Sequence, residues 1–438
     1  MSRRKSYRLP PTGLTFSYME KAPPTSAFVS KTLALALPLL FLPPSGAGAS
    51  AAFANLASAR DTNVILQDPR AFKCICYSGY RDGQAPGQSE PTETQVRQDL
   101  VLIKRFAHEI RTYGSAKGSH GHRVPKLADE LGLNVHLGVW VDATYDDAAN
   151  QAAVNDAIAL VKEGHKSIKS VVVGNEYMLR VRHPEITPTP DIKPDKAASE
   201  AKLTAWVKQV KAGMPKGVEV TTADTWAEIN ADGDELLSQL DFITWHLHPW
   251  WEDQDIGNAM TYLESRYNSV TERVARFPGK RIVLGETGWP TQATRGAAVG
   301  NPENQMRFFR DLTVWGFSHN AEFWSFTAFD EKWKDAEGTV GGHWGLWFSN
   351  RQPGAIITGI NALYPKYMWS ENPDLASGTR IASPRNALVR TSDAGPRPID
   401  ALGRAVEPRW ERNGAGRSGH GWTLTPVGSS RGLILMVH

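Results

Sequence analysis

Two short sequence patterns place a glutamate where a chemical role is expected. Val-Val-Gly-Asn-Glu ends at Glu176, and Leu-Gly-Glu-Thr-Gly-Trp-Pro surrounds Glu286. Each glutamate follows an apolar run, where a buried strand gives way to a loop, which suggests two acids facing each other across a pocket. Paired carboxylates suit glycosidic-bond cleavage: one donates a proton to the leaving oxygen, and the other meets the positive charge that develops at the anomeric carbon. The sequence therefore predicts an enzyme.

The elements that must position these acids form a repeating pattern from about residue 70. Each repeat has a short apolar or β-branched run, a polar loop and an amphipathic helical stretch, as in the spacing of Val96, Leu100 and Ile103. Strands are expected at 71–77, 109–113, 134–141, 170–174, 218–223, 242–245, 281–285 and 322–328. Helices are expected at 94–107, 124–131, 148–163, 196–214, 258–277 and 302–317.

Eight βα units predict an α/β protein with a (β/α)8 TIM barrel, formed by one catalytic domain over residues 70–368. An open doubly wound sheet is the alternative. That fold would be expected to have a glycine-rich phosphate turn after the first strand, and Tyr77-Ser78-Gly79-Tyr80 is not one.

In such a barrel the carboxyl ends of the strands converge on one cavity. Glu176 and Glu286 would follow the fourth and seventh strands, on opposite walls, and Asn175 would hold a sugar hydroxyl beside the scissile bond. Of the fifteen tryptophans, eight lie at or just past strand ends, where aromatic faces would stack on sugar rings. The residues expected to bind substrate are Tyr77, Tyr113, Asn175, Asp224, His246, His248, Trp250, Trp289, Phe329, Glu331 and Lys334.

Other chemistries fit the sequence less well. His246-Leu247-His248 has a spacing that suits metal binding, but no third ligand is recognisable, so hydrogen bonding to substrate is favoured and neither a metal nor a cofactor is expected. A serine hydrolase would need a Gly-x-Ser-x-Gly elbow after a strand, and residues 70–368 contain none. Cys74 and Cys76 alternate along one strand, point the same way and are expected to be buried and unbridged.

The two ends of the chain differ in composition from the centre. Basic residues exceed acidic ones by five in 1–51 and by three in 371–438, so the net charge of +3 leaves the centre near −5, which argues against nucleic acid as a partner. Residues 1–54 combine basic residues, a short apolar run and small residues, which predicts a signal peptide or anchor. Export to the periplasm, cell surface or medium is expected, with membrane association through this segment as an option. Residues 371–438, rich in Arg, Gly, Pro and Ser, are expected to form an irregular tail.

Taken in order, these motifs resemble family-17 glycoside hydrolases. The similarity covers about 300 residues and includes Ile110-Arg-Thr-Tyr-Gly114, Val173-Gly-Asn-Glu176, Ala223-Asp-Thr-Trp226, Glu286-Thr-Gly-Trp-Pro290 and Phe329-Asp-Glu331 with Lys334. The resemblance implies a (β/α)8 barrel and a retaining mechanism on β-1,3-glucan, with Glu176 as acid/base, Glu286 as nucleophile, and Glu331 and Lys334 as supporting polar residues. His248-Pro249 stands where plant members usually have Tyr-Pro, and the Tyr-Ser-Gly-Tyr-Arg-Asp-Gly-Gln opening is closer to exported bacterial members.

The expected mechanism is a double displacement through a glycosyl-enzyme. Ionised Glu286 attacks while protonated Glu176 assists the leaving group and then acts as base, and the negative charge on Glu286 helps keep Glu176 protonated. Retention predicts carboxyl groups roughly 5–5.5 Å apart, whereas inversion needs a wider gap. A β-glucan transglycosylase that builds or branches glucan through β-1,3 or β-1,6 links is the alternative. A non-catalytic glucan-binding protein is a further one; no protein partner is implied.

Overall fold

The computed structural model describes residues 72–187, 191–337 and 340–363, together with short strands at 65–66, 423–426 and 433–436. Contacts divide the chain into two units, one formed by 1–59 and 68–370 and the other by 60–67 and 371–438. The expected leader at 1–54, and most of the expected tail at 371–438, lie outside the described residues.

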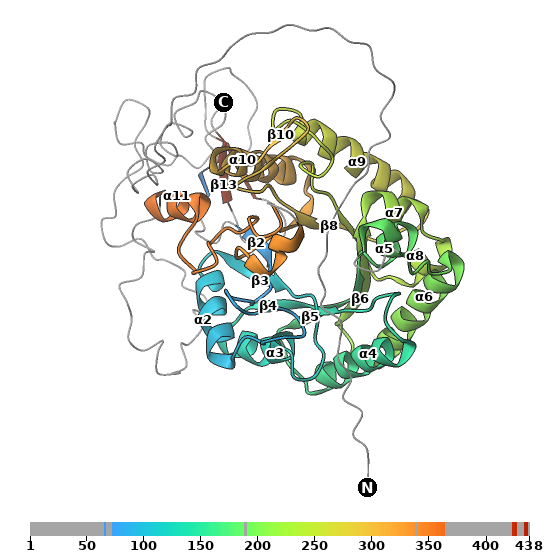
Figure 1. The fold of residues 1–438 in the computed structure, drawn as a ribbon. Helices are drawn as coiled ribbons and strands as arrows, with labels where there is room; N and C mark the ends of the chain where they lie inside the picture. Colours follow the sequence, from blue (N-terminus) through green and yellow to red (C-terminus); the bar gives the residue numbers. More distant parts are fainter. Residues whose placement is uncertain are drawn as a thin grey trace, which may run out of the picture. The chain divides into compact units, whose positions relative to one another are not determined.

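Eight parallel strands of the first unit close into a barrel in the order β11-β2-β3-β4-β5-β6-β7-β8 (Figure 1). Closure is explicit because β11 pairs with both β2 and β8, as in Trp324 with Cys74 and Phe323 with Leu284. The (β/α)8 fold is confirmed, and an open doubly wound sheet is excluded. The strands are β2 (Phe72–Cys76), β3 (Ala107–Arg111), β4 (Asn134–Val139), β5 (Ile168–Asn175), β6 (Glu219–Thr225), β7 (Ile243–His246), β8 (Ile282–Thr287) and β11 (Glu322–Ser325).

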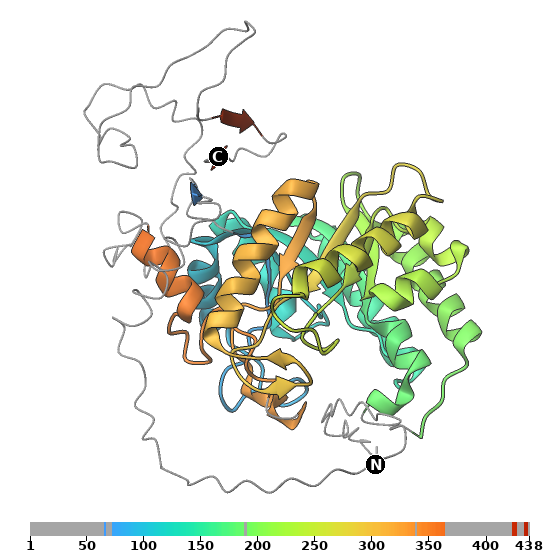
Figure 2. The ribbon, with the colours of Figure 1, turned by 90° about the horizontal axis from the view of Figure 1, so that it is seen from above.

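Helices surround the outside of the barrel, as Figures 1 and 2 show. The long ones are α2 (Glu93–Lys104), α3 (His120–Leu131), α4 (Asp147–Lys162), α6 (Lys196–Gly213), α9 (Ala259–Val274), α10 (Pro302–His319) and α11 (Ala355–Leu363). Shorter elements are α5 (Tyr177–Arg182), α7 (Trp226–Ala231), α8 (Asp234–Gln239), the 3₁₀ turns η1 (Pro184–Ile186) and η2 (Lys332–Glu337), and a hairpin of β9 (Thr294–Arg295) and β10 (Ala298–Val299). Within the described part of the chain, none of the helices combines the length and hydropathy needed to cross a membrane.

Local signals explain where these helices begin and end. The Thr92 side chain accepts from the Gln95 N–H while the Gln95 side chain bonds back to Thr92, a reciprocal cap that starts α2. Ser119 caps α3 in the same position, so this helix begins at His120, four residues before the sequence-based boundary, and Gly132 ends it in the left-handed conformation. The six-residue helices α5, α7 and α8 were not predicted because one and a half turns carry too little periodicity to detect.

Successive side chains of each barrel strand point alternately outward to the helices and inward to the barrel axis. The apolar side chains therefore form two layers. Ile75, Val171 and Val173 belong to the large core beneath the helices. The intervening residues fill the barrel interior, where the apolar side chains are Cys74, Cys76, Val172, Ala223, Phe242, Val283 and Trp324. Both cysteines are free and buried, as expected from their alternation. Burial raises the pKa of Cys76 to about 12, because a thiolate there would lose its hydration.

The second unit contains a small antiparallel sheet in the order β1-β13-β12. Its strands are β1 (Ile65–Leu66), β12 (Thr423–Pro426) and β13 (Leu433–Met436). The apolar run that closes the sequence therefore forms a strand rather than irregular chain.

Candidate active site

Glu176 lies directly after β5, in a backbone conformation that the sequence prepares for it. Its φ and ψ are 50° and 39°, a left-handed conformation that costs a non-glycine residue energy, and Gly174 two positions earlier has φ 81°. The Glu176 N–H donates to the Ala223 carbonyl at 2.7 Å. Asp224 Oδ2 accepts from the Met178 N–H at 2.8 Å and so holds the first turn of α5. These contacts fix the direction in which the Glu176 side chain leaves the backbone.

Glu286 lies near the end of β8 and is only 5% exposed. The glycine before it makes room for the neighbouring strand. A Cβ on Gly285 would lie 2.2 Å from Thr244 Cγ2 and 3.4 Å from the ring of His246. The absence of a side chain on Gly285 therefore leaves space for the Thr244 methyl group of β7, while the His246 ring lies at contact distance.

The two glutamates meet across His246. One oxygen of Glu176, one nitrogen of His246 and one oxygen of Glu286 all lie within 4.8 Å of one another. His246 Nδ1 is 3.1 Å from Glu176 Oε1, and His246 Nε2 is 3.7 Å from Glu286 Oε1. This oxygen–oxygen approach is comparable to the carboxyl separation of retaining glycosidases, roughly 5–5.5 Å, which is shorter than that of inverting ones.

Arg111, at the end of β3, links Glu286 to Asn175. Its guanidinium pairs with Glu286 Oε1 through Nη1 and donates to Asn175 Oδ1 through Nη2, and the side chain is completely buried. The guanidinium carbon also lies 4.2 Å from the centre of the Tyr113 ring. Arg111 was named in the motif but not among the expected site residues. A charged residue at the end of an apolar strand was the available signal, because a buried guanidinium needs an anionic partner.

The charges around Glu286 determine its ionisation. Burial by itself would raise the pKa of this carboxyl, but the neighbouring His246 ring and the Arg111 guanidinium, with a further contribution from His248, hold it well below its usual range. His248 Nε2 lies 3.6 Å from Glu286 Oε2. Glu286 is therefore ionised, which is the state that a nucleophile needs.

Several predicted residues lie around this centre. Glu331 pairs with Lys334 at 2.7 Å and accepts from Trp333 Nε1 at 3.0 Å. The Lys334 ammonium lies 5.2 Å from the centre of the Phe326 ring. Next to His248, the indoles of Trp250, Trp251 and Trp344 pack together; Trp251 and Trp344 are stacked with centres 6.1 Å apart. Among the tryptophans at strand ends, the partly exposed ones are Trp140, Trp226, Trp251 and Trp333.

Several of the residues expected to bind substrate are almost completely buried. Tyr77 and Trp289 are 0% exposed, and Phe329 and Asp224 are 1% exposed. Trp289 Nε1 donates to the Val299 carbonyl at 2.9 Å and its ring packs on Phe308. These side chains support the site, since their bonds and packing partners belong to the protein. Trp250 is also buried, at 3% exposed.

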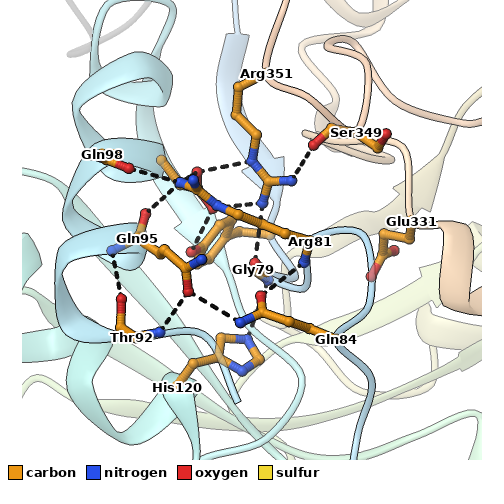
Figure 3. A network of polar contacts seen from close by, with 12 residues as sticks. Gly79, Arg81, Gln84, Thr92, Gln95, Gln98, His120, Glu331, Ser349 and Arg351 are labelled. Carbon is orange, nitrogen blue, oxygen red and sulfur yellow. Dashed lines mark hydrogen bonds and ion pairs between the residues drawn. The ribbon is translucent and has the colours of Figure 1, made fainter. Parts of the chain in front are cut away.

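The loop after β2 is held by a network of polar contacts that includes Arg81 and Arg351 (Figure 3). Asp99 of α2 is 0% exposed, pairs with Arg81 at 2.9 Å and Arg351 at 2.8 Å, and accepts from the Tyr77 hydroxyl at 3.3 Å. Arg351 also donates to the Gly79 carbonyl at 3.0 Å. Because the Tyr77 hydroxyl bonds to the same carboxylate as the two arginines, Tyr77 helps to position this loop. Sequence analysis missed Asp99 because its partners are 18 and 252 residues away.

Among the residues that the structure describes, two sets of side chains have the composition of a metal site. The first is Glu176, His246 and Glu286, and the second is Glu109, His136 and Glu322. In the first set, Glu176 and Glu286 are the further candidate ligands that sequence analysis did not recognise beside His246. In both sets a cation would compete with existing positive charge, because Arg111 pairs with Glu286 and Lys73 with Glu322. The geometry at Glu176 and Glu286 suits proton transfer and nucleophilic attack.

Comparison with known proteins agrees with this reading. Residues 74–345 match the model described as the BtgE/BtgC glycoside hydrolase domain. A glucan 1,3-beta-glucosidase of Schizosaccharomyces pombe is 28% identical over 261 residues, which cover 58% of this chain and 77% of that protein. A btgC protein of Aspergillus niger is 25% identical over 296 residues, which cover 62% of this chain but 41% of that protein.

Solved structures share the barrel fold. A glycoside hydrolase family 17 beta-1,3-glucanosyltransferase from Rhizomucor miehei has a TM-score of 0.55 and 24% identity, covering 65% of this chain and 96% of that one. An endo-laminarinase from Formosa has a TM-score of 0.53 and 23% identity, covering 64% of this chain and 84% of that one.

Proposed function

Because the chain belongs to the BtgE/BtgC glycoside hydrolase family, we propose that it cleaves β-1,3-linked glucan with retention of configuration. The observation that carries the proposal is the close approach of Glu176 to Glu286, within 4.8 Å, around a nucleophile kept ionised by Arg111. The names of the relatives support the substrate class.

In this reaction Glu286 attacks the anomeric carbon as Glu176 gives its proton to the leaving oxygen. Arg111 keeps Glu286 ionised and holds the Asn175 side chain in place, so that the amide would meet a hydroxyl of the bound sugar. In the second half of the cycle Glu176 takes a proton from the acceptor, which displaces the sugar from Glu286. The mechanism requires no metal or cofactor.

The test is turnover of laminarin oligomers by Glu286→Gln and Glu176→Gln, with the exposed Glu272→Gln on α9 as matched control. Both site variants should lose nearly all activity while Glu272→Gln keeps it. The first product released should be the β-anomer, followed by nuclear magnetic resonance before mutarotation. Near-normal rates for Glu286→Gln, or an α-anomer, would refute the assignment.

Transfer to a second glucan is the alternative outcome of the same chemistry. It is favoured by the low exposure of Glu286 and by the aromatic side chains of Trp251 and Trp344 next to His248, because a site that excludes water prolongs the life of the glycosyl-enzyme. Mass analysis of products from one defined oligomer separates the two: shorter chains alone indicate hydrolysis, and longer chains indicate transfer. A glucan-binding protein without turnover gains no support, since both acids are present and paired through His246.

The proposal includes export directed by residues 1–54. It is supported by the order of basic, apolar and small residues in that segment. Cell fractionation of the full chain and of a variant lacking residues 1–54 checks it: the full chain should appear outside the cytoplasm, and the shortened one should remain inside.

A further inference from the structure

His246 contacts both glutamates and is itself shielded from the substrate side. The residue ends β7, its side chain is 1% exposed, and its backbone pairs with Thr225 on one side and Glu286 on the other. Nδ1 is 3.1 Å from Glu176 Oε1. Among the described residues Nε2 has no hydrogen-bond partner, and it lies 3.7 Å from Glu286 Oε1. The expectation that His246 binds substrate is therefore replaced by a different role.

We propose that His246 is a positioning residue that acts on Glu176, as a neutral imidazole with its proton on Nε2. In this form the protonated Glu176 carboxyl donates to Nδ1, and the Nε2–H points to ionised Glu286. The inference rests on the proposed glycosidase function and deepens it, because it explains how Glu176 is kept ready to donate.

The other two protonation forms of the His246 ring fit Glu176 and Glu286 less well. With the proton on Nδ1, the lone pair of Nε2 would face the ionised carboxylate of Glu286 and repel it. A doubly protonated imidazolium would favour the ionised form of Glu176 and so remove the proton that the leaving group needs. Only the Nε2–H tautomer matches a protonated acid on one side and an ionised nucleophile on the other.

The titratable and charged groups that face this assembly come from five elements. They are Glu176 after β5, Glu286 on β8, Asp224 on β6, Arg111 on β3 and His248 after β7. Arg111 and His248 both face Glu286 rather than His246. In this part of the chain His246 is thus the titratable group in hydrogen-bond contact with Glu176.

The proton balance over the cycle is simple under this proposal. As the Glu286–carbon bond forms and the glycosidic bond breaks, the Glu176 proton passes to the leaving oxygen. Ionised Glu176 then faces the lone pair of Nδ1, an unfavourable contact that strengthens it as a base. When the acceptor oxygen bonds to the anomeric carbon and the ester breaks, the acceptor proton moves to Glu176 and the bond to Nδ1 is restored. The His246 proton stays on Nε2 throughout.

Two amide substitutions separate the two nitrogens of His246. In His246→Asn the amide oxygen takes the place of Nδ1 and still accepts from Glu176, whereas in His246→Gln the longer amide reaches the place of Nε2 and donates to Glu286. His246→Ala removes both contacts. The pH dependence of kcat/KM is measured for each variant, together with thermal unfolding to confirm that it is folded.

We expect the alkaline limb of the profile to move to lower pH by about one unit in His246→Ala and His246→Gln and to stay in place in His246→Asn, which corresponds to about tenfold lower kcat/KM above the limb. The loss should be smaller on a 2,4-dinitrophenyl laminarioligosaccharide, whose leaving group needs no proton. A uniform loss with unmoved limbs, or an alkaline limb that moves to higher pH, would overturn the proposal. Failure of the glycosidase function itself is distinguishable, because Glu286→Gln would then keep wild-type turnover.

Discussion

The barrel holds two clusters of the same composition, two glutamates and one histidine, and they differ in how fully their polar atoms are bonded. The catalytic cluster is Glu176, His246 and Glu286; the second, which we call the lower cluster, is Glu109, His136 and Glu322, from the first three residues of their strands. In the lower cluster both nitrogens of His136 are bonded, to Ser170 Oγ at 2.8 Å and to Glu109 Oε2 at 3.0 Å.

The surroundings of the two clusters also differ: neighbouring side chains hold the lower cluster more completely than the catalytic cluster. The His136 ring stacks on Trp324 with centres 4.4 Å apart, so it has no freedom to serve another partner. In the catalytic cluster Glu176 has left-handed backbone and is partly exposed, and His246 Nε2 has no hydrogen-bond partner among the described residues. Strain and incomplete bonding are typical of sites that change charge during function, whereas complete bonding stabilises a fold. Residue type alone does not distinguish the two.

Exchanging one glutamate for glutamine in each cluster gives the largest expected difference. Glu286→Gln should lower kcat on laminarin oligomers by about 10⁴-fold, because it removes the nucleophile. Glu109→Gln should leave kcat within about twofold, since its contacts are structural. Steady-state rates check both, and circular dichroism shows that each variant is folded. A large loss of kcat in a folded Glu109→Gln would mean that the lower cluster takes part in catalysis.

Removing Arg111 tests the charge balance of the catalytic cluster. In Arg111→Gln the burial of Glu286 is less compensated, so the pKa of Glu286 should rise towards its ordinary range. As pH falls, Glu286 is then protonated at a higher pH than in wild type, so the acid limb of the kcat/KM profile should move to higher pH. At the acid end of the wild-type profile, kcat/KM of the variant should be about 10²-fold lower than that of wild type.

Arg351→Gln is the control for this substitution, because it also removes a buried guanidinium paired to a carboxylate, Asp99. Its profile should keep the wild-type acid limb even where the protein is less stable. An acid limb unmoved by Arg111→Gln would show that His246 and His248 suffice to keep Glu286 ionised.

These contrasts explain what sequence could and could not supply. The eight strands were predictable because parallel strands buried on both faces are continuous apolar runs, and the two glutamates stood out because polar groups follow such runs only at strand ends. The strand predicted at 109–113 is β3 (Ala107–Arg111), two residues earlier, which leaves Tyr113 in the loop and makes Arg111 the terminal residue.

What remained hidden depends on contacts distant in sequence. The pairing of Arg111 with Glu286 spans 175 residues, and that of His246 with Glu176 spans 70. Aromatic type at a strand end likewise did not reveal whether a ring faces substrate: Trp289 packs on Phe308 of α10, while Trp251 is partly exposed. Such outcomes are set by tertiary packing, which one sequence does not display.

The lower cluster should contribute to the acid dependence of stability. Burial would raise the pKa of Glu109, but the His136 hydrogen bond and charge lower it to about 2. A folded-state pKa below the unfolded one stabilises the protein above the unfolded value, and this contribution is lost as pH falls through the folded value. Glu109→Gln should therefore lower the free energy of unfolding by about 2–3 kcal/mol at pH 7.

The difference between wild type and Glu109→Gln should disappear as pH falls from about 4.5 towards 2. Urea unfolding at several pH values measures it. A difference that stays constant over this range would assign the stabilisation to packing rather than to ionisation.

The smallest effect is expected from Lys73→Gln, which removes the positive charge that pairs with Glu322 of the lower cluster. Lys73 lies 2.8 Å from Glu322 but its side chain is 48% exposed, so water and salt screen the pair, and the change in the free energy of unfolding should be below about 1 kcal/mol. Added salt should shrink even this difference, and kcat/KM should equal that of wild type. A fall in kcat/KM with unchanged stability would contradict the separate roles of the two clusters, because it would show that charge at the lower cluster affects Glu286 through the packed barrel interior.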